Sequence, residues 1–290
     1  MKTLFCIKTF RKPDILEGIL QSLYDYGYTE GNSVIVADDS PGEEFEVAKK
    51  FPFVDAYLTG DIHGIWANGN RLISYALKSD ADMVILSDND YVMVREGLLE
   101  EFETAHVGNN QDHIMGYVVD SDGKDGLEIT FPRTAESDHL RWAPGCHGVM
   151  LWFTKEMLKK VGYIMPFKYG YGYEHSDISS RALMIQGYCP NLYPSLLRST
   201  KFFKLNPDDH HVYTWDLAKT YAENSPMFHE RESQTIRGIN LKQHESGLRK
   251  ELVISRGDFD KWSPEAIKAF ISKKPDRIKV RRGNSCEVHQ

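Results

Sequence analysis

Over residues 1–90, short apolar runs alternate with segments whose apolar residues recur every three or four positions. A continuous apolar run predicts a strand buried on both faces, and the longer period predicts a helix with one buried face. The predicted strands lie at 3–9, 33–40, within 47–60 and at 82–90, and the predicted helices at 15–27 and 68–79. Because strands alternate with helices, we expect a Rossmann-like α/β fold with a mixed, mainly parallel sheet flanked by helices.

Beyond residue 100 the pattern is less regular and indicates a smaller mixed or antiparallel part. Strands are predicted at 113–120 and 127–133, a strand followed by a helix with Thr154 as N-cap over 147–163, and helices at 178–188, near 230–247 and at 263–272. We therefore expect one domain over 1–215, with halves at 1–100 and 101–215, and a small helical C-terminal extension over 216–290.

Composition narrows the class of protein. Hydrophobic residues make up 41% and charged residues 27% of the 290 positions, as in globular proteins. No run approaches the roughly 20 apolar residues of a membrane span, and the N-terminus lacks signal-peptide features, so we expect a cytoplasmic protein. The four cysteines are widely spaced and are expected to be reduced thiols. The net charge of -7 gives no general attraction to nucleic acid, and the basic stretch at 273–282 is interpreted as a solvated tail.

Two predicted strands end in carboxylates, which would meet at the edge where α/β sheets bind ligands. Asp88 and Asp90 have the spacing to share a divalent cation such as Mg²⁺ or Mn²⁺, although a solvated acidic turn is the competing interpretation. Asp38 and Asp39 offer acceptors for a nucleobase or ribose, or else form a turn. Arg71, near the start of a predicted helix, has the chemistry to bind a phosphate, but taken alone it is better interpreted as a surface arginine.

The stretch at 169–181, YGYGYEHSDISSR, gathers acids and an imidazole beside glycines and tyrosines. The tyrosines offer flat faces for a sugar ring, and the glycines permit close approach of a ligand. Glu174 and Asp177 would share one face of a first helical turn, where acids also suit the helix dipole. His175 has the chemistry of a general base, and we expect a neighbouring carboxylate to raise its pKa.

Taken in order, these segments resemble the GT-A-fold glycosyltransferases of family 2. The segments are TFRKP, VIVADDS, NGNRLISYAL and VILSDNDYVM, followed by GCHGVMLWFTKEMLKKVGY and YGYGYEHSDISSRALMIQGY. The last two also resemble the β-1,4-galactosyltransferases, in which a "GG-V-S-LSK--F---NGF" segment leads to a "WGWGGEDDD--NR" segment. The resemblance covers roughly residues 1–215.

The resemblance implies a nucleotide-diphosphate sugar donor, with a UDP-sugar expected first, and a divalent metal, commonly Mn²⁺. The half at 1–100 would bind the nucleotide and the half at 101–215 the acceptor. By position, the nucleotide site would comprise Phe10, Arg11, Asp38, Asp39, Arg71 and Asp88. Asp90 would be the direct metal ligand, with Asp88 contacting metal or ribose. The acceptor would be held by Tyr171, Gly172 and Tyr173.

The sequence departs from the related enzymes at the base. Where they carry an acidic residue after the glutamate, this chain has His175. His175 is therefore the first candidate base, with Glu174 and Asp177 as alternatives, and a role in binding acceptor or sugar is also open. A late histidine often completes the metal site in these folds, which points to His210 or His211; two exposed loop histidines are the competing interpretation.

The resemblance implies transfer of a hexose-like sugar to an acceptor hydroxyl by single displacement with inversion. The acceptor classes considered are a glycan, a lipid-linked saccharide, a protein and a hydroxylated nucleobase in DNA. One alternative is a nucleotidyltransferase or another nucleotide-sugar enzyme, although TFRKPD is not the glycine-rich loop that it would need. The other is a catalytically degenerate sugar-binding module, for which His175 is the best support.

Overall fold

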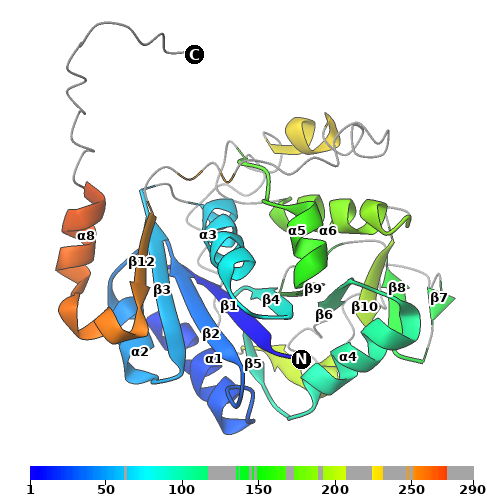
Figure 1. Ribbon diagram of the computed structural model, residues 1–290, viewed down its shortest axis with the longest axis horizontal. Coiled ribbons are helices and arrows are strands. Elements are labelled where there is room, and N and C mark those ends of the chain that lie inside the picture. Colours follow the sequence, from blue (N-terminus) through cyan, green and yellow to red (C-terminus); the bar gives the residue numbers. More distant parts are fainter. Residues whose placement is uncertain are drawn as a thin grey trace, which may run out of the picture.

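The computed structural model describes most of the chain. The described residues are 1–61, 64–116, 135–136, 138–143, 146, 149–167, 173–188, 192–206, 224–230, 246, 248 and 251–272. They form one large sheet with helices on both faces, and a second sheet of two short strands (Figure 1). None of the helices in these ranges is long and apolar enough to cross a membrane.

The predicted order of strands and helices in the first part of the chain is confirmed. The strands are β1 (Thr3–Thr9), β2 (Ser33–Asp38), β3 (Val54–Gly60) and β4 (Met83–Ser87), and the helices between them are α1 (Pro13–Asp25), α2 (Glu43–Lys50) and α3 (Ile65–Lys78). The four strands are parallel, in the spatial order β3-β2-β1-β4. Their carboxyl ends therefore lie along one edge, as expected for an α/β fold.

The later strands make the sheet mixed. After the short strand β5 (Tyr91–Met93) come α4 (Leu98–Asn109), β6 (His113–Gly116), β7 (Ala135–Glu136), β8 (Leu140–Ala143), β9 (Met150–Thr154), α5 (Lys155–Val161), α6 (Glu174–Ile185), β10 (Tyr193–Leu196), a 3₁₀ turn at Ser199–Lys201 and β11 (Phe203–Leu205). Strand β9 runs antiparallel between β4 and β6. The predicted cap is confirmed, because the Thr154 hydroxyl accepts from the Met157 N–H at 3.2 Å. The predicted strand at 127–133 lies outside the described residues.

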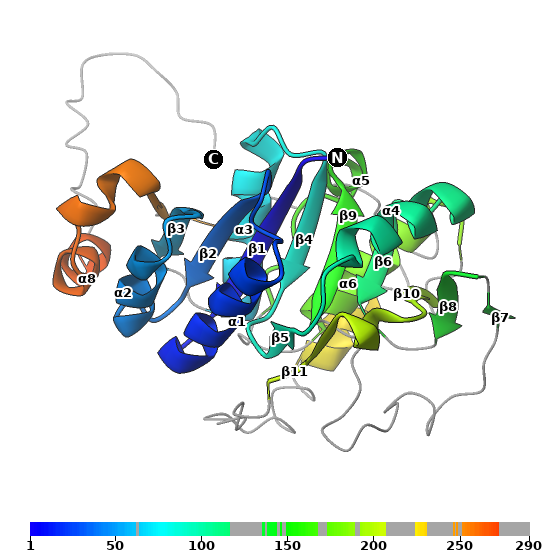
Figure 2. The ribbon, with the colours of Figure 1, turned by 90° about the horizontal axis from the view of Figure 1, so that it is seen from below.

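Alternate residues of the central strands face two separate apolar cores, as the two-residue period of a strand requires. Phe5 and Ile7 join the core under α1, α2 and α4, whereas Leu4 and Cys6 join the core under α3, α5 and α6. Figure 2 shows these two layers of helices on either side of the sheet. Every residue of β1 is buried, which explains its nearly continuous apolar sequence.

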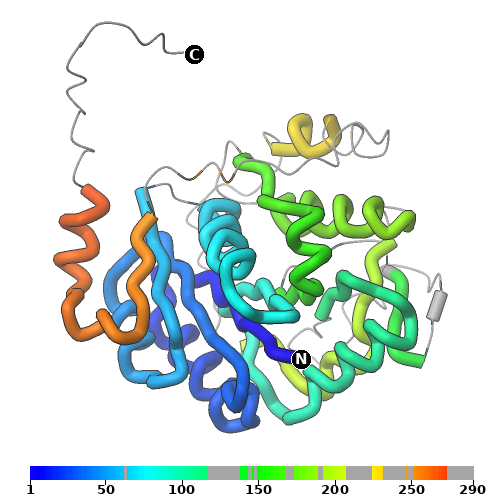
Figure 3. Tube along the Cα trace, viewed as in Figure 1, coloured from blue at the N-terminus to red at the C-terminus, as the bar shows by residue number. Residues whose placement is uncertain are grey.

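The extension contributes to the main sheet as well as adding helix. Strand β12 (Glu251–Ser255) lies antiparallel beside β3 at one edge, and Figure 3 shows the two running side by side. A 3₁₀ segment at Arg256–Lys261 and helix α8 (Pro264–Ser272) follow, and α8 packs against α2. Helix α8 confirms the predicted helix at 263–272, while β12 was not predicted. The predicted helix near 230–247 lies almost wholly outside the described residues, and a short helix is present at 224–230.

Candidate active site

Side-chain hydrogen bonds join the carboxyl end of β1 to α3 and to the segment that follows β4. The Asn68 amide of α3 donates to the Thr9 carbonyl at 3.2 Å, and the Asn89 amide donates to the Thr9 hydroxyl at 2.9 Å. Asn68 and Asn89 are both buried. The segment that follows β4 is thereby fixed against the end of β1 and against α3.

Asp39 and Arg71 form a buried ion pair beside this edge. Oδ1 of Asp39 lies 2.6 Å from a guanidinium nitrogen of Arg71, which also donates to Asn68 at 2.7 Å. Oδ2 of Asp39 accepts from the Gly64 N–H at 2.5 Å. The side chains of Arg71 and Asp39 are only 1% and 5% exposed, so Arg71 neutralises Asp39 and is not the surface arginine of the competing interpretation.

Asp38 faces the protein interior. Oδ1 accepts from the Ser40 N–H at 2.7 Å and from the Ser40 hydroxyl at 3.0 Å, while Oδ2 accepts from the Tyr57 hydroxyl. Burial, reinforced by the nearby Glu44 carboxylate, raises the pKa of Asp38 to about 7. Asp38 therefore supports the loop after β2 from behind, in the manner of the predicted turn.

The raised pKa of Asp38 gives a testable stability effect. Between about pH 4 and pH 7 the unfolded chain loses this proton and the folded chain keeps it, so stability falls as pH rises through that window. In Asp38→Asn this contribution is absent. We expect the difference in the free energy of unfolding, wild type minus Asp38→Asn, to decrease by on the order of 3–4 kcal/mol as the pH rises from about 4 to about 7. Urea denaturation at each pH measures this difference. A difference that stays constant with pH would contradict the assignment.

Phe10 and Arg11 are the accessible members of the predicted nucleotide site. Phe10 is 38% exposed, and the Arg11 guanidinium carbon lies 4.9 Å from the centre of its ring. Arg11 has a φ of 52°, the left-handed region that residues other than glycine seldom adopt, and its N–H donates to the Ser40 hydroxyl at 2.8 Å. Backbone strain of this kind is often found at ligand sites.

A lysine that the sequence analysis did not single out lies at the centre of the site. Nζ of Lys8 is 2.7 Å from Oδ1 of Asp88 and 2.8 Å from Nε2 of His175. Oδ2 of Asp88 is 3.7 Å from the same histidine nitrogen. The signal in the sequence is a lysine near the end of an otherwise apolar strand, where a charge is costly unless it is paired. These contacts bring the end of β4 together with the start of α6.

The pKa of His175 is lowered, in contrast to the expected rise. Burial is the largest cause and the positive charge of Lys8 the second, and together they outweigh Glu174 and Asp88. The prediction considered only the adjacent carboxylate, because neither burial nor Lys8 can be seen in the local sequence. His175 is therefore a neutral imidazole at physiological pH.

Glu174 begins α6 and turns toward the same cluster. Its side chain is 4% exposed, and Oε1 lies 3.4 Å from Nδ1 of His175. The other oxygen, Oε2, is buried without a hydrogen-bond partner among the described residues. A buried carboxylate oxygen without a donor is costly, which makes Oε2 a candidate to bind a ligand hydroxyl.

Asp177 faces away from the cluster. Its Oδ2 accepts from Arg181 at 2.7 Å and from the Met165 N–H at 3.0 Å. Arg181 also donates to the carbonyls of Val161 and Tyr163, and the side chains of Asp177 and Arg181 are 2% and 1% exposed. Asp177 therefore anchors the segment between α5 and α6 onto α6. Its carboxylate already accepts hydrogen bonds from Arg181 and from the Met165 N–H.

Removal of Asp177 is expected to affect stability. Asp177→Ala leaves the buried Arg181 guanidinium without its carboxylate, and we expect a loss of about 3–5 kcal/mol in the free energy of unfolding. Urea denaturation checks this value, with the exposed Glu156→Ala as control. A loss below about 1 kcal/mol would show that the pair is not structural.

Aromatic rings from the C-terminal extension pack against Tyr173, the residue just before α6. The rings of Tyr173 and Phe228 stack at a centroid distance of 4.6 Å, and His229 lies edge-on to Tyr173 at 6.3 Å. Of the predicted acceptor residues, Tyr173 is therefore placed beside Glu174 with one ring face against the helix at 224–230. Tyr171 and Gly172 lie outside the described residues.

Asp90 lies at the junction of β4 and β5. Strand β11 pairs antiparallel with β5, and the Asn206 N–H that follows it donates to the Asp90 carbonyl at 2.8 Å. The predicted histidine ligands His210 and His211 lie just beyond Asn206, outside the described residues. In the part of the chain that the structure describes, no three acidic, histidine or cysteine side chains are grouped to hold a metal.

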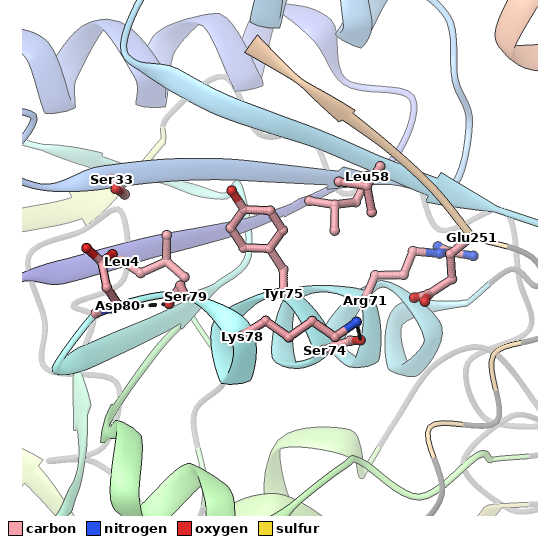
Figure 4. Close-up of a pocket in the computed structure, with 12 residues that line it drawn as sticks. Leu4, Ser33, Leu58, Arg71, Ser74, Tyr75, Lys78, Ser79, Asp80 and Glu251 are labelled. Atoms are coloured by element: carbon pink, nitrogen blue, oxygen red, sulfur yellow. Dashed lines mark hydrogen bonds between the residues drawn. The ribbon is translucent and has the colours of Figure 1, made fainter. Parts of the chain in front are cut away.

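A separate cavity of about 430 Å³ lies between α3 and the strands β1, β3 and β12. Figure 4 shows Tyr75, Lys78 and Glu251 around it, with Ser33 and Leu4 from the starts of their strands. Its lining extends from the start of β1 to Glu251, which pairs with Gly60 at the carboxyl end of β3, and it includes Arg71 of the buried ion pair.

Comparison with known proteins identifies the fold. No protein-family model and no curated protein matches the chain, so its resemblance to family 2 and to the galactosyltransferases stays a prediction. Among solved structures, residues 1–349 of S. aureus TarS superpose with a TM-score of 0.57, at 11% identity over 83% of this chain and 70% of that one. TarS in complex with UDP gives a TM-score of 0.53 at 13% identity, over 70% and 60% of the two chains.

A mannosyltransferase from Pyrobaculum calidifontis, in complex with GDP-Man and Mn²⁺, superposes with a TM-score of 0.54. It is 15% identical over 81% of this chain and 69% of the mannosyltransferase. TarS and the mannosyltransferase are GT-A-type glycosyltransferases. The chain therefore has the GT-A-type glycosyltransferase fold, which confirms the predicted fold class.

Proposed function

We propose that the protein is a metal-dependent glycosyltransferase that moves a sugar from a nucleotide-diphosphate donor, with a UDP-sugar expected first, to an acceptor hydroxyl with inversion. The observation that carries the proposal is the contact between the two halves of the site: His175 at the start of α6 lies 3.7 Å from Asp88 at the end of β4. A donor bound at the strand ends and an acceptor bound at α6 would therefore meet.

The nucleotide is proposed to bind over β1 and β2. Phe10 and Arg11 present an exposed ring and a guanidinium at this edge, which suit a base and a phosphate. The Asp39–Arg71 pair would form the inner wall, and Asp38 would hold the loop that carries it. The TarS complex with UDP and the mannosyltransferase complex with GDP-Man have the same fold, which supports a nucleotide-sugar site here.

The metal is proposed to bind at Asp90. Carboxylate oxygens suit Mg²⁺ and Mn²⁺, and Asp88 is already paired with Lys8, which leaves Asp90 as the main protein ligand. Position 210 is four residues beyond Asn206, a span of at most about 14 Å, so a ligand from His210 or His211 is within reach. When bound, the ion would neutralise the diphosphate leaving group.

Glu174 is the base that the geometry favours. The lone pair on Nε2 of His175 faces Lys8, and the carboxylate of Asp177 is held by Arg181. Oε2 of Glu174 has no partner among the described residues and belongs to the same cluster. In the proposed step, Glu174 takes the proton of the acceptor hydroxyl, that oxygen bonds to C1 of the sugar, and the bond from C1 to the diphosphate breaks.

A thermal-shift screen tests the proposal. UDP-, GDP- and dTDP-sugars are added to the full chain with and without Mn²⁺, and the melting temperature is recorded. A donor at about 100 times its Kd should raise the melting temperature by roughly 5 °C, only when Mn²⁺ is present. If none of the nucleotide sugars stabilises the protein, the proposal fails. Stabilisation without turnover would instead favour the sugar-binding module.

A further inference from the structure

Lys8 is buried where the two halves of the site meet. It is 5% exposed and extends from β1 on the face that α3, α5 and α6 cover, as its alternation with Leu4 and Cys6 requires. Its ammonium contacts Asp88 at 2.7 Å and Nε2 of His175 at 2.8 Å. A buried lysine with a carboxylate on one side and an imidazole on the other is a costly arrangement, and both of these partners belong to the site.

The hydrogen-bonding chemistry of these contacts determines which ring nitrogen of His175 carries the proton. An ammonium has three donors and no acceptor, so the imidazole nitrogen that faces it must accept. A neutral imidazole carries its single proton on one nitrogen only, and Nε2 acts here as the acceptor. The proton of His175 must then be on Nδ1, which lies 3.4 Å from Oε1 of Glu174.

We propose that Lys8 is a positioning residue that holds His175 in the Nδ1–H tautomer and thereby fixes Glu174. Nδ1, which then carries the proton, lies 3.4 Å from Oε1 and attracts this carboxylate oxygen, while Oε2 remains for the acceptor hydroxyl. Lys8 also gives Asp88 a cation from the protein itself and links the donor side of the site to the acceptor side. The role of Glu174 toward the acceptor rests on the proposed function, whereas the tautomer of His175 does not depend on it.

The tautomer can be measured without donor, metal or acceptor. The full chain is labelled with ¹⁵N in its histidine rings, and long-range ¹H–¹⁵N spectra are recorded near pH 8, above the ordinary pKa of about 6.5 for histidine. His175→Gln identifies the signals of His175 among the 11 histidines. The wild type should show a proton on Nδ1 and a lone pair on Nε2. Lys8→Met should shift the population toward the Nε2–H tautomer, which an imidazole prefers in water.

The control is Lys159→Met, which removes an exposed lysine and should leave the His175 signals unchanged. Circular dichroism confirms that each variant is folded. A wild-type spectrum with the proton on Nε2 would overturn the proposal even if Lys8→Met did not fold. A folded Lys8→Met with the wild-type tautomer would also overturn it.

Kinetics then separate this inference from the proposed function. Once a donor is known, Lys8→Met should lower kcat by about 100-fold, because small misplacements of a reacting group have effects of that size, and the KM for the donor should change little. Absence of transfer in the wild type would reject the proposed function but leave the tautomer result standing. A change in donor KM alone, with kcat retained, would count against the positioning role.

Discussion

Asp90→Asn is expected to lower sugar transfer by about a thousandfold or more. Asp90 lies between β4 and β5, and its carbonyl accepts a hydrogen bond from the Asn206 N–H. The backbone of Asp90 is therefore fixed at the edge of the sheet. A cation bound at this carboxylate would offset the charge that develops on the diphosphate, an effect of several kcal/mol, and about 4 kcal/mol corresponds to a thousandfold. Transfer is measured as nucleoside diphosphate released at saturating Mn²⁺.

The matched control for Asp90→Asn is Asp258→Asn, which changes an exposed aspartate paired with Lys261. The control should keep wild-type turnover and the Mn²⁺-dependent thermal shift, whereas Asp90→Asn should lose both. Because Asp90 is half-buried and not part of either apolar core, we expect its variant to remain folded. Full activity of Asp90→Asn in the presence of EDTA would show that the metal assignment is wrong.

Glu174→Gln is expected to reduce transfer by about 100- to 10,000-fold while donor binding is retained. The amide keeps the shape of the side chain but cannot take a proton from the acceptor. Because we propose that Glu174 faces the acceptor and not the donor, the Mn²⁺-dependent thermal shift with donor should be that of the wild type. The loss should therefore be in kcat, measured with saturating donor.

Two variants make the result for Glu174 specific. Glu156→Gln changes an exposed glutamate on α5 and should leave transfer unchanged. His175→Gln tests the residue that the sequence resemblance ranked first. If His175→Gln loses more activity than Glu174→Gln while both variants bind donor, histidine is the base and the assignment to Glu174 is wrong.

The alternation of apolar runs and amphipathic segments was sufficient to predict the first half of the fold. Buried parallel strands such as β1 and β2 have nearly continuous apolar sequences. Asp38 at the end of β2 and Asp88 just after β4 indicated the edge at which the candidate site lies. Strand β12 was missed because it is an edge strand with every second residue exposed, and its partner β3 is far away in sequence.

The roles of the residues at the start of α6 could not be predicted from their neighbours in sequence. Lys8 and His175 are 167 positions apart, and their contact determines which nitrogen of the histidine carries a proton. The pair of Asp177 and Arg181 has the i,i+4 spacing of a helical ion pair, a signal that was present in the sequence. Its structural role became evident only with the burial of both side chains.

The most direct test of the account is the product formed from a nucleotide-diphosphate sugar. The full chain is incubated with UDP- and GDP-sugars and Mn²⁺, with water or a hydroxyl compound as acceptor, and nucleotides are separated by chromatography. We predict release of the nucleoside diphosphate from at least one donor, dependent on the metal and lost in Asp90→Asn and Glu174→Gln. Release of the nucleoside monophosphate, or no turnover of any donor that binds, would contradict the account.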